Sequence, residues 1–493
     1  MKKGFAAAVI SYLIASLCII SDARAAQEGR RPGRGPRTEA ALPSEVAAFK
    51  ELSVILGRPA ENSVTVSVLS GSALEAFIEY GKEAGKYAFK TENVLLKADS
   101  PAEFLLDKLE KDTKYFFRLE SRNPAGGTFK TGEPGCFHTC RAAGSAFTFE
   151  IQGDSHPERP QMFLPELYSK TLRAAAADLP DFYMTMGDDF SVDTLSAVDA
   201  ASVKKIYLRQ RYYLSLLGHS TPVFLINGNH EQAAGYLLDG TDTNAAVLAG
   251  KNRNAYFPLP EPGQFYSGDR EEVKYVGLLH DYYSWTWGDA LFVALDPYWH
   301  SKVAVDNVMG GGPKRRDLWQ VTLGDEQYKW LKKTLEESKA KYKFVFAHHV
   351  LGTGRGGIEM AGQFEWGGKN KSGGDEFAQK RPGWELPVHQ LMVKNGVTIF
   401  FQGHDHIFCR QELDGITYQE VPVPAAPDYN PISMADYTTG DKFNGSGRVR
   451  VSVNPERVKV EYVRSHLEKD ATPGHPDGEI AFSYELPAKK GSR

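Results

Sequence analysis

The sequence lacks the features that mark several classes of protein. It has only 4 cysteines in 493 residues, which excludes a small fold held together by disulfides. Basic residues are not in excess: 58 Lys and Arg stand against 62 Asp and Glu, so a nucleic acid polymer is not a favoured partner. Beyond the N-terminus no apolar run approaches the roughly eighteen residues of a membrane span, and we expect no stable membrane insertion.

What is present is ordinary globular composition at a length that favours several domains. Hydrophobic residues make up 42% of the chain and charged residues 24%, values typical of a protein that builds a core. A single core stops growing at roughly 250–300 residues. The 493 residues therefore predict two or more domains, and the oligomeric state stays open.

Residues 1–25 have the pattern of a secretory signal peptide. Basic residues are followed by an apolar run and a small-x-small cleavage site: Lys2 and Lys3, then 5–20, then Ala23-Arg24-Ala25. The run is short for a membrane anchor. We expect a mature protein that begins at Ala26 and is periplasmic or secreted.

The cysteines that remain after such cleavage are Cys136, Cys140 and Cys409. An oxidising compartment would permit a disulfide between Cys136 and Cys140, which the sequence leaves open. A structural zinc ion needs four ligands, and only His138 joins these two cysteines locally. We interpret Cys409 as a small buried residue rather than a nucleophile.

A flexible linker is expected at 26–42, where Arg, Pro and Gly gather without apolar periodicity. From 43 to 141 short alternating runs predict β-strands, for example around Val66, Ile78 and Phe117. The stretch 109–115, which ends in Tyr115, resembles the tyrosine corner of fibronectin type III and related domains. That resemblance implies an N-terminal β-sandwich and says nothing about a partner.

Strands alternate with helices from 143 to about 465, which predicts an α/β domain. Strands are expected at 147–151, 182–186 and 343–347, with helices between them, and a hairpin is expected at 449–462. Thr322 to Asp325 fits a capping box at the start of one helix. Glycine-rich segments lie at 310–313 and 352–374, and residues 466–493 read as a C-terminal tail.

Five apolar strands each end in a polar cluster. The clusters are Gly153-Asp154-Ser155-His156, Gly187-Asp188-Asp189, Gly228-Asn229-His230-Glu231, Ala347-His348-His349 and Gly403-His404-Asp405-His406. Ligands of open α/β sheets bind outside the carboxyl ends of strands, so these clusters are expected to converge. Their oxygen and nitrogen donors suit Mn, Fe, Co or Zn better than calcium. The sequence therefore predicts a metal site.

These motifs, in this order, resemble the calcineurin-like metallophosphoesterase superfamily, and the preceding sandwich makes the chain most similar to purple acid phosphatases. The implied fold is α/β: an N-terminal β-sandwich followed by a metallophosphoesterase α/β sandwich domain. The resemblance also implies two metal ions, of divalent or mixed valence. The first would be held by Asp154, His156, Asp188 and His406, and the second by Asp188, Asn229, His348 and His404.

The same resemblance assigns the chemistry. The metals would activate a water, and the resulting metal-bound hydroxide would attack phosphorus in line with the leaving group. His230 would protonate the leaving oxygen, with Glu231 as a residue that orients it. Two divalent ions against two carboxylates leave about +2, which suits a small phosphorylated substrate.

The chain departs from purple acid phosphatases at two positions. Ser191 stands where those enzymes carry a metal-bound tyrosine, and His156 is present where they lack a histidine. In the fourth motif the pattern selects His348 as the ligand, and His349 stays open as the alternative because strand alternation directs only one of them to the site.

The function that follows is an exported dimetal phosphoesterase, with phosphomonoesters favoured over phosphodiesters. The alternative is a non-catalytic, metal-stabilised binding protein of the cell surface. The metal identity and the pH optimum stay open at this point. The presence of every expected ligand and of the proton donor favours the enzyme.

Overall fold

The computed structural model describes residues 41–306, 317–351, 355–426 and 432–488. The expected signal peptide, the linker up to residue 40 and the glycine-rich segment 310–313 lie outside these residues. From Leu42 onward the chain forms one compact unit. In the parts of the chain that are described, no helix has both the length and the apolar character to cross a bilayer.

The N-terminal region consists of two small antiparallel sheets that enclose a core of their own. One sheet has the order β1 (Leu52–Gly57), β2 (Val64–Ser70), β6 (Ala102–Leu106). The other contains β3 (Leu74–Gly81) and β7 (Lys114–Arg122), joined by β4 (Phe89–Lys90), β5 (Val94–Leu96), β8 (Lys130–Thr131) and β9 (Gly135–His138). Val66, Ile78 and Phe117 share one buried cluster, which confirms the alternating strands read from the sequence.

The expected tyrosine corner is formed. The backbone N–H of Glu110 donates a hydrogen bond of 3.0 Å to the hydroxyl of Tyr115, and the ring of Tyr115 is buried. This bond ties the start of β7 to the turn before it. Cys136 and Cys140 are both free thiols, because the extended backbone of β9 separates them.

Two larger sheets pack face to face in the rest of the chain. The first has the order β12 (Val223–Leu225), β11 (Phe182–Thr185), β10 (Phe147–Gln152), β23 (Gly447–Val453), β24 (Arg457–Arg464), β25 (Ile480–Pro487). The second has the order β13 (Ser267–Gly268), β16 (Tyr283–Trp287), β17 (Ala290–Ala294), β18 (Tyr342–Phe346), β19 (Ile399–Gln402), β21 (Ile416–Glu420), β20 (Phe408–Leu413), β22 (Asp441–Phe443). Aromatic side chains fill the space between them, for example Phe149 and Phe292 with ring centroids 5.1 Å apart.

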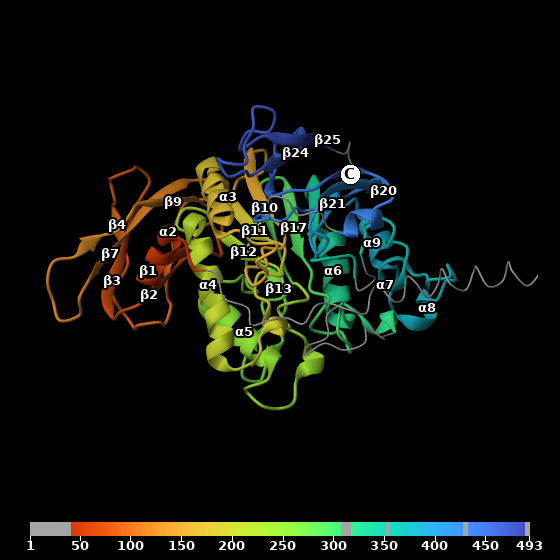
Figure 1. Ribbon diagram of the computed structural model, residues 1–493, viewed down its shortest axis with the longest axis horizontal. Coiled ribbons are helices and arrows are strands. Elements are labelled where there is room, and N and C mark those ends of the chain that lie inside the picture. The colour runs from red at the N-terminus through yellow and green to blue at the C-terminus, as the bar shows by residue number, and fades with distance from the viewer. Residues whose placement is uncertain (1–40, 307–316, 352–354, 427–431, 489–493) are drawn as a thin grey trace, which may run out of the picture. The chain divides into compact units, whose positions relative to one another are not determined.

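Helices cover the outer faces of both sheets (Figure 1). The first sheet packs against α3 (Pro165–Asp178), α4 (Ala200–Gly218) and α5 (Ala245–Tyr256). The second packs against α6 (Asp325–Glu337), α7 (Phe364–Gly367) and α9 (Val388–Lys394). Short elements complete the fold: α2 (Ser44–Ala47), α8 (Phe377–Lys380) and the pair β14 (Glu272–Val273) and β15 (Gly277–Leu278). The result is the predicted α/β sandwich, which here has four layers.

The expected capping box at Thr322 is wrong. The residue that precedes α6 is Gly324, with φ of 79°, and no side chain caps the helix. The hydroxyl of Thr322 instead donates to the buried carboxylate of Glu365 at 2.6 Å. The hydroxyl of Thr322, which the sequence pattern assigned to the start of α6, therefore binds a residue that is distant in the sequence.

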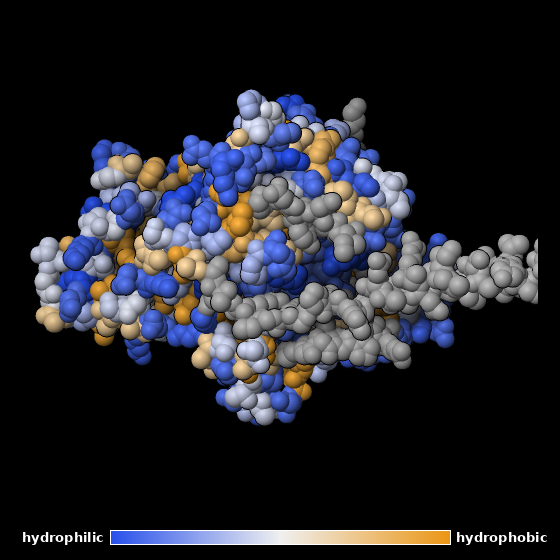
Figure 2. Space-filling view, viewed as in Figure 1, coloured by the Kyte–Doolittle hydropathy of each residue, from blue (hydrophilic) through white to orange (hydrophobic). Residues whose placement is uncertain are grey.

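Residues expected as a C-terminal tail supply a strand. β25 pairs antiparallel with β24, beside the hairpin of β23 and β24 that the sequence predicted. Tyr484 of β25 is 9% exposed and joins the core between the two sheets. On the face in Figure 2, hydrophilic residues predominate and hydrophobic ones form small groups.

Candidate metal centre

Parallel pairing brings the five polar clusters to one place. β10, β11 and β12 run parallel in the first sheet, and β17, β18 and β19 run parallel in the second. The loops after β10, β11, β12, β18 and β19 therefore leave the sheets at matching edges. Every expected metal ligand is at most 4% exposed: Asp154, His156, Asp188, Asn229, His348, His404 and His406.

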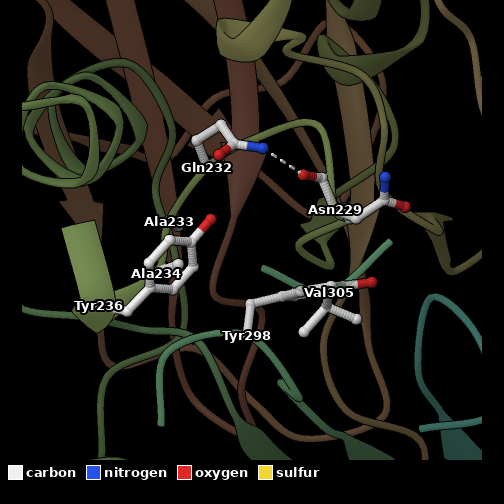
Figure 3. Close-up of a pocket in the computed structure, with 8 residues that line it drawn as sticks. Asn229, Gln232, Ala233, Ala234, Tyr236, Tyr298 and Val305 are labelled. Atoms are coloured by element: carbon white, nitrogen blue, oxygen red, sulfur yellow. Dashed lines mark hydrogen bonds between the residues drawn. The ribbon is translucent and has the colours of Figure 1, made fainter. Parts of the chain in front are cut away.

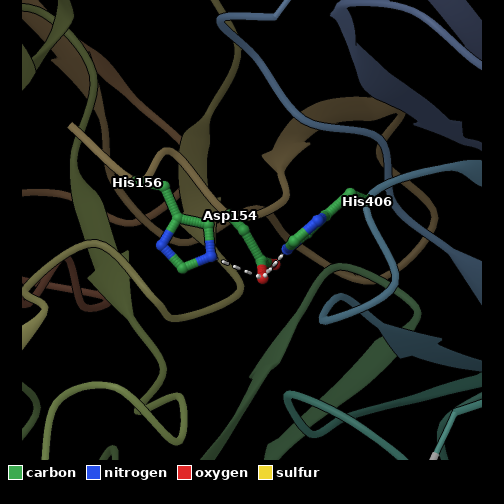
Figure 4. Close-up of side chains that lie close together, drawn as sticks. All are labelled: Asp154, His156 and His406. Carbon is green, nitrogen blue, oxygen red and sulfur yellow. Dashed lines mark hydrogen bonds and ion pairs between the residues drawn. The ribbon is translucent and has the colours of Figure 1, made fainter. Parts of the chain in front are cut away.

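Asp154, His156 and His406 form one group of potential ligands, shown in Figure 4. Oδ2 of Asp154 lies 2.9 Å from Nε2 of His406 and 3.6 Å from Nε2 of His156. Both imidazole rings therefore present Nε2 to the same carboxylate. The planes of the two rings are at 86° to each other.

Asp188, His348 and His404 form a second group. Oδ2 of Asp188 lies 3.2 Å from Nε2 of His348, and that nitrogen lies 3.3 Å from Nδ1 of His404. Oδ1 of Asn229 is 3.1 Å from the same nitrogen of His348. Asp188 also lies 3.6 Å from His156 of the first group, so its carboxylate stands between the two groups.

The loops that carry these ligands hold unusual backbone conformations. His156, Asp188, His404 and His406 have φ of 43°, 58°, 74° and 66°, in the left-handed region that non-glycine residues rarely adopt. A Cβ on Gly228 would lie 2.3 Å from Oδ1 of Asp188. Only glycine fits there, and it lets the loop after β12 approach the carboxylate closely.

The donor set fits divalent cations. Nε2 of His156 is buried without a hydrogen-bond partner among the described residues, although it faces Asp154 and Asp188. Burial lowers the pKa of His156 to about 4, so its imidazole is neutral and keeps a lone pair for a metal. Burial by itself would raise the pKa of Asp188, but His348 and His230 hold it well below its ordinary value. Such ions need ionised carboxylates and neutral imidazoles. Burial by itself would lower the pKa of His348, but Asp188 and Asp154 raise it to about 10, so a metal that binds there would displace a proton from this ring.

The two adjacent histidines of the fourth motif have different surroundings. His348 lies in the second group of ligands, and its Nδ1 is 2.7 Å from the backbone oxygen of Met186. Nδ1 of His349 instead lies 3.0 Å from the hydroxyl of Tyr298. The geometry favours His348 as the ligand, as the sequence pattern had selected.

His230 lies beside the two groups and forms a third set of potential ligands with His156 and Asp188. Its Nε2 is 3.7 Å from Oδ2 of Asp188, and its Nδ1 is 2.8 Å from Oδ1 of Asp193. Asp193 therefore fixes the orientation of the ring. No sequence pattern pointed to Asp193, which follows the second motif in a short 3₁₀ turn, η2 (Val192–Thr194).

Glu231 does not have the position expected of it. Its carboxylate accepts hydrogen bonds from four backbone N–H groups: Asp188 at 3.1 Å, Asp189 at 2.8 Å, Phe190 at 2.9 Å and Gly228 at 2.6 Å. Glu231 thus holds the loops after β11 and β12 against each other. We replace the orienting role assigned to it with this structural role, because a carboxylate occupied by these amides is not directed at His230.

Two acidic residues contact candidate ligand histidines, and a third, Asp405, pairs with Arg355. Oε1 of Glu158 lies 3.1 Å from Nδ1 of His156, and Oδ2 of Asp306 lies 3.4 Å from Nε2 of His404. Oδ1 of Asp405 accepts a hydrogen bond of 2.7 Å from Arg355. Carboxylates on the outer nitrogen of a ligand histidine fix its orientation. Sequence reasoning missed Glu158 and Asp306 because an isolated acidic residue in a loop carries no pattern.

A small pocket with about 10 Å³ of free space adjoins Asn229 (Figure 3). It is lined by Gly228, Asn229, Gln232, Ala233, Ala234, Tyr236, Tyr298 and Val305. The amide of Gln232 donates 2.7 Å to the backbone oxygen of Asn229 and so fixes one wall. The pocket lies next to the second group of ligands, and its free space admits little more than one water molecule.

A model of the calcineurin-like phosphoesterase family matches residues 151–408, which include all the residues of the two groups. The chain belongs to the calcineurin-like phosphoesterase family. The chain is therefore a phosphoesterase. Its clustered His and Asp side chains are suited to hold divalent metal ions.

Solved structures agree with this fold. A structure of PhoD is 15% identical, with a TM-score of 0.64 over 92% of this chain and 92% of that one. The purple acid phosphatase PPD1 from seeds of yellow lupin (Lupinus luteus) is 17% identical, with a TM-score of 0.57 over 88% of this chain and 74% of that one. At these identities the likeness concerns the fold. No curated protein sequence matches the chain.

Proposed function

We propose that this phosphoesterase is an exported enzyme that uses two metal ions and hydrolyses phosphomonoesters in preference to phosphodiesters. The observation that carries the proposal is the position of Asp188. Its Oδ2 lies 3.2 Å from His348 of one ligand group and 3.6 Å from His156 of the other. A carboxylate shared by two sets of histidines is what a pair of cations held side by side requires.

The first ion would be held by Asp154, His156, Asp188 and His406, and the second by Asp188, Asn229, His348 and His404. When bound, the ions would supply the positive charge that binds a phosphate ester and activates water. Two carboxylates leave two divalent ions with about +2 in total. That charge suits the dianion of a phosphomonoester better than the single charge of a diester.

The protein's own part in the reaction is assigned to His230. Asp193 holds Nδ1 of this ring at 2.8 Å, which directs Nε2 toward the ligand groups. A proton on Nε2 would pass to the leaving oxygen as the bond to phosphorus breaks.

Export rests on the pattern of residues 1–25, which reads as a signal peptide with cleavage before Ala26. Mass spectrometry of the protein secreted or released from the periplasm would show an N-terminus at Ala26. An intact Met1 in active protein would contradict this part of the proposal.

The test of activity is a screen of purified mature protein, loaded in turn with Fe, Mn, Zn or Co, against monoesters, diesters and nucleotides. We expect turnover with at least one metal and faster hydrolysis of 4-nitrophenyl phosphate than of bis(4-nitrophenyl) phosphate. Protein that holds two metals and hydrolyses none of these compounds would contradict the proposal and favour a non-catalytic binding protein.

A further inference from the structure

An arginine reaches the edge of the candidate metal centre from the loop after β10. One guanidinium nitrogen of Arg159 lies 2.5 Å from Nε2 of His230, the nitrogen that faces the ligand groups. Its side chain is 18% exposed, so the guanidinium lies at the boundary between the centre and solvent. Its charge also lowers the pKa of His156, after the larger effect of burial.

The buried carboxylate of Glu158 holds Arg159 in place. Nε of Arg159 lies 3.2 Å from Oε1 of Glu158, and the same oxygen lies 3.1 Å from Nδ1 of the ligand His156. Glu158 therefore fixes a metal ligand and the guanidinium at once. This coupling sets the distance between Arg159 and the first ligand group.

The guanidinium nitrogen that faces the candidate metal centre has a weak hydrogen-bond partner, the imidazole of His230. Arginine has N–H donors and no acceptor, so the nitrogen of His230 must accept this hydrogen bond. A phosphate oxygen is a stronger acceptor, and arginine meets phosphate with two parallel hydrogen bonds. A phosphate bound at the ligand groups would draw the guanidinium from His230, which leaves Nε2 of that ring able to carry a proton for the leaving group.

We propose that Arg159 binds the phosphate of the substrate and makes the site selective for dianionic phosphomonoesters. The inference rests on the proposed function. A monoester offers a further charged oxygen to a guanidinium, whereas a diester replaces that oxygen with a second ester bond. Arg159 is thus a specificity residue supplied by the protein rather than by a metal.

The test measures binding of inorganic phosphate to metal-loaded protein by calorimetry, which needs no turnover. We expect Arg159→Ala to raise the Kd about 10–100-fold, the range for loss of a hydrogen bond to a charged group. Arg159→Lys keeps the charge without the paired donors and should recover part of the loss. The matched control is Arg173→Ala, which removes the same charge from an exposed residue of α3 that pairs with Glu45.

Turnover gives a second readout. Arg159→Ala should lower kcat/KM for 4-nitrophenyl phosphate by about 10–100-fold and for bis(4-nitrophenyl) phosphate by clearly less. Elemental analysis should find the metal content of the variant unchanged. If the alanine variant does not fold, Arg159→Lys and Arg159→Gln take its place in both measurements.

Three outcomes would overturn the inference: phosphate binding within twofold of the wild type, equal losses for both esters, or loss of metal from a folded variant. The last would make Arg159 a support of the ligand His156. Failure of the proposed function would look different, because wild-type protein would then bind metal and phosphate but hydrolyse no ester.

Discussion

Replacing Asp188 with Asn removes one negative charge from the point where the two ligand groups meet. Oδ2 of Asp188 faces His348 and His156, so both candidate metal positions lose the same ligand. We expect Asp188→Asn to bind less than half of the wild-type metal, measured by elemental analysis after removal of free ions.

The neighbouring Asp189 provides the matched control. It is equally buried, but its Oδ1 accepts hydrogen bonds from Gln152 at 3.0 Å and Ser155 at 2.6 Å rather than facing the ligand groups. Asp189→Asn should therefore keep its metal. Two metals retained by Asp188→Asn, or equal losses from both variants, would refute the bridging position.

His230 permits a test that separates proton donation from metal binding. His230→Ala should keep its metal and lower turnover of an alkyl phosphate by about 10²–10⁴-fold. The loss should shrink for 4-nitrophenyl phosphate, whose leaving group departs as a stabilised anion. Steady-state rates across a series of leaving groups measure this dependence. A uniform loss would assign His230 to phosphate binding, and loss of metal would make it a ligand.

Asp193 should affect the same step through His230. The 2.8 Å contact between Asp193 and Nδ1 of His230 fixes the imidazole ring. Loss of such an orienting partner typically lowers activity by about 10–100-fold. Asp193→Asn is expected to lower turnover by that factor with the leaving-group dependence of His230→Ala. In the double variant the two losses should not multiply, since both act on one ring. Fully multiplicative losses would show that Asp193 acts elsewhere.

The candidate ligands could be proposed from the sequence because each follows a strand in a short motif, whereas no such motif marks the residues that contact them. Asp193 meets His230 across 37 residues of sequence, and Asp306 meets His404 across the gap between different loops. Such pairs depend on how loops fold over the edge of the sheets. The opposite error occurred at Glu231, where adjacency to His230 in sequence was taken for contact in space.

Among the secondary-structure elements, those with a regular apolar pattern were predicted well. β2, β3, β7, β10 and β23 carry apolar residues at alternate positions, a pattern that the sequence reveals directly. β25 was missed because 480–487 follows a polar stretch, and its burial depends on pairing with β24. The capping box failed for a related reason, since the hydroxyl of Thr322 found Glu365, 43 residues away.

β25 is expected to contribute strongly to stability. It pairs along its length with β24, and Phe482 and Tyr484 pack on the core between the sheets. Ending the chain at Gly478 should lower the free energy of unfolding by about 3–6 kcal/mol, from two aromatic side chains at roughly 1.5–3 kcal/mol each. Urea unfolding measures the change.

Removal of residues 489–493 alone is the control for this truncation and should leave the unfolding midpoint in place. If the longer truncation does not fold, Tyr484→Ala tests the same packing with a smaller expected loss of about 3 kcal/mol. An unchanged midpoint in either variant would show that β25 adds no stability.

For the molecule as a whole, the N-terminal sandwich and the phosphoesterase domain share one hydrophobic cluster. Ile55 of β1 and Leu69 of β2 pack with Leu216 and Leu217 of α4. A Cβ on Gly218 would lie 3.1 Å from Ile55, so α4 approaches β1 closely at its last residue. This shared core implies that the two regions unfold together.

Arg211 of α4 lies in that contact and is fully buried. Its guanidinium donates to the hydroxyl of Ser53 at 2.9 Å, to the backbone oxygen of Ser67 at 3.0 Å and to the backbone oxygen of Tyr256. Burial lowers its pKa to about 9, because the charged guanidinium loses its hydration. One side chain thus joins both strands of the sandwich edge to two helices of the domain.

Arg211→Met keeps the apolar length of the side chain and removes its hydrogen bonds to Ser53, Ser67 and Tyr256. We expect the free energy of unfolding to fall by about 2–4 kcal/mol, the cost of losing these buried hydrogen bonds to a charged group. The wild type should unfold in a single transition, and the variant should show a first transition at lower urea as the sandwich separates. Fluorescence and circular dichroism followed together measure this. Arg173→Met, at an exposed position of α3, should leave the curve unchanged, and identical curves for both variants would mean that Arg211 does not join the two regions.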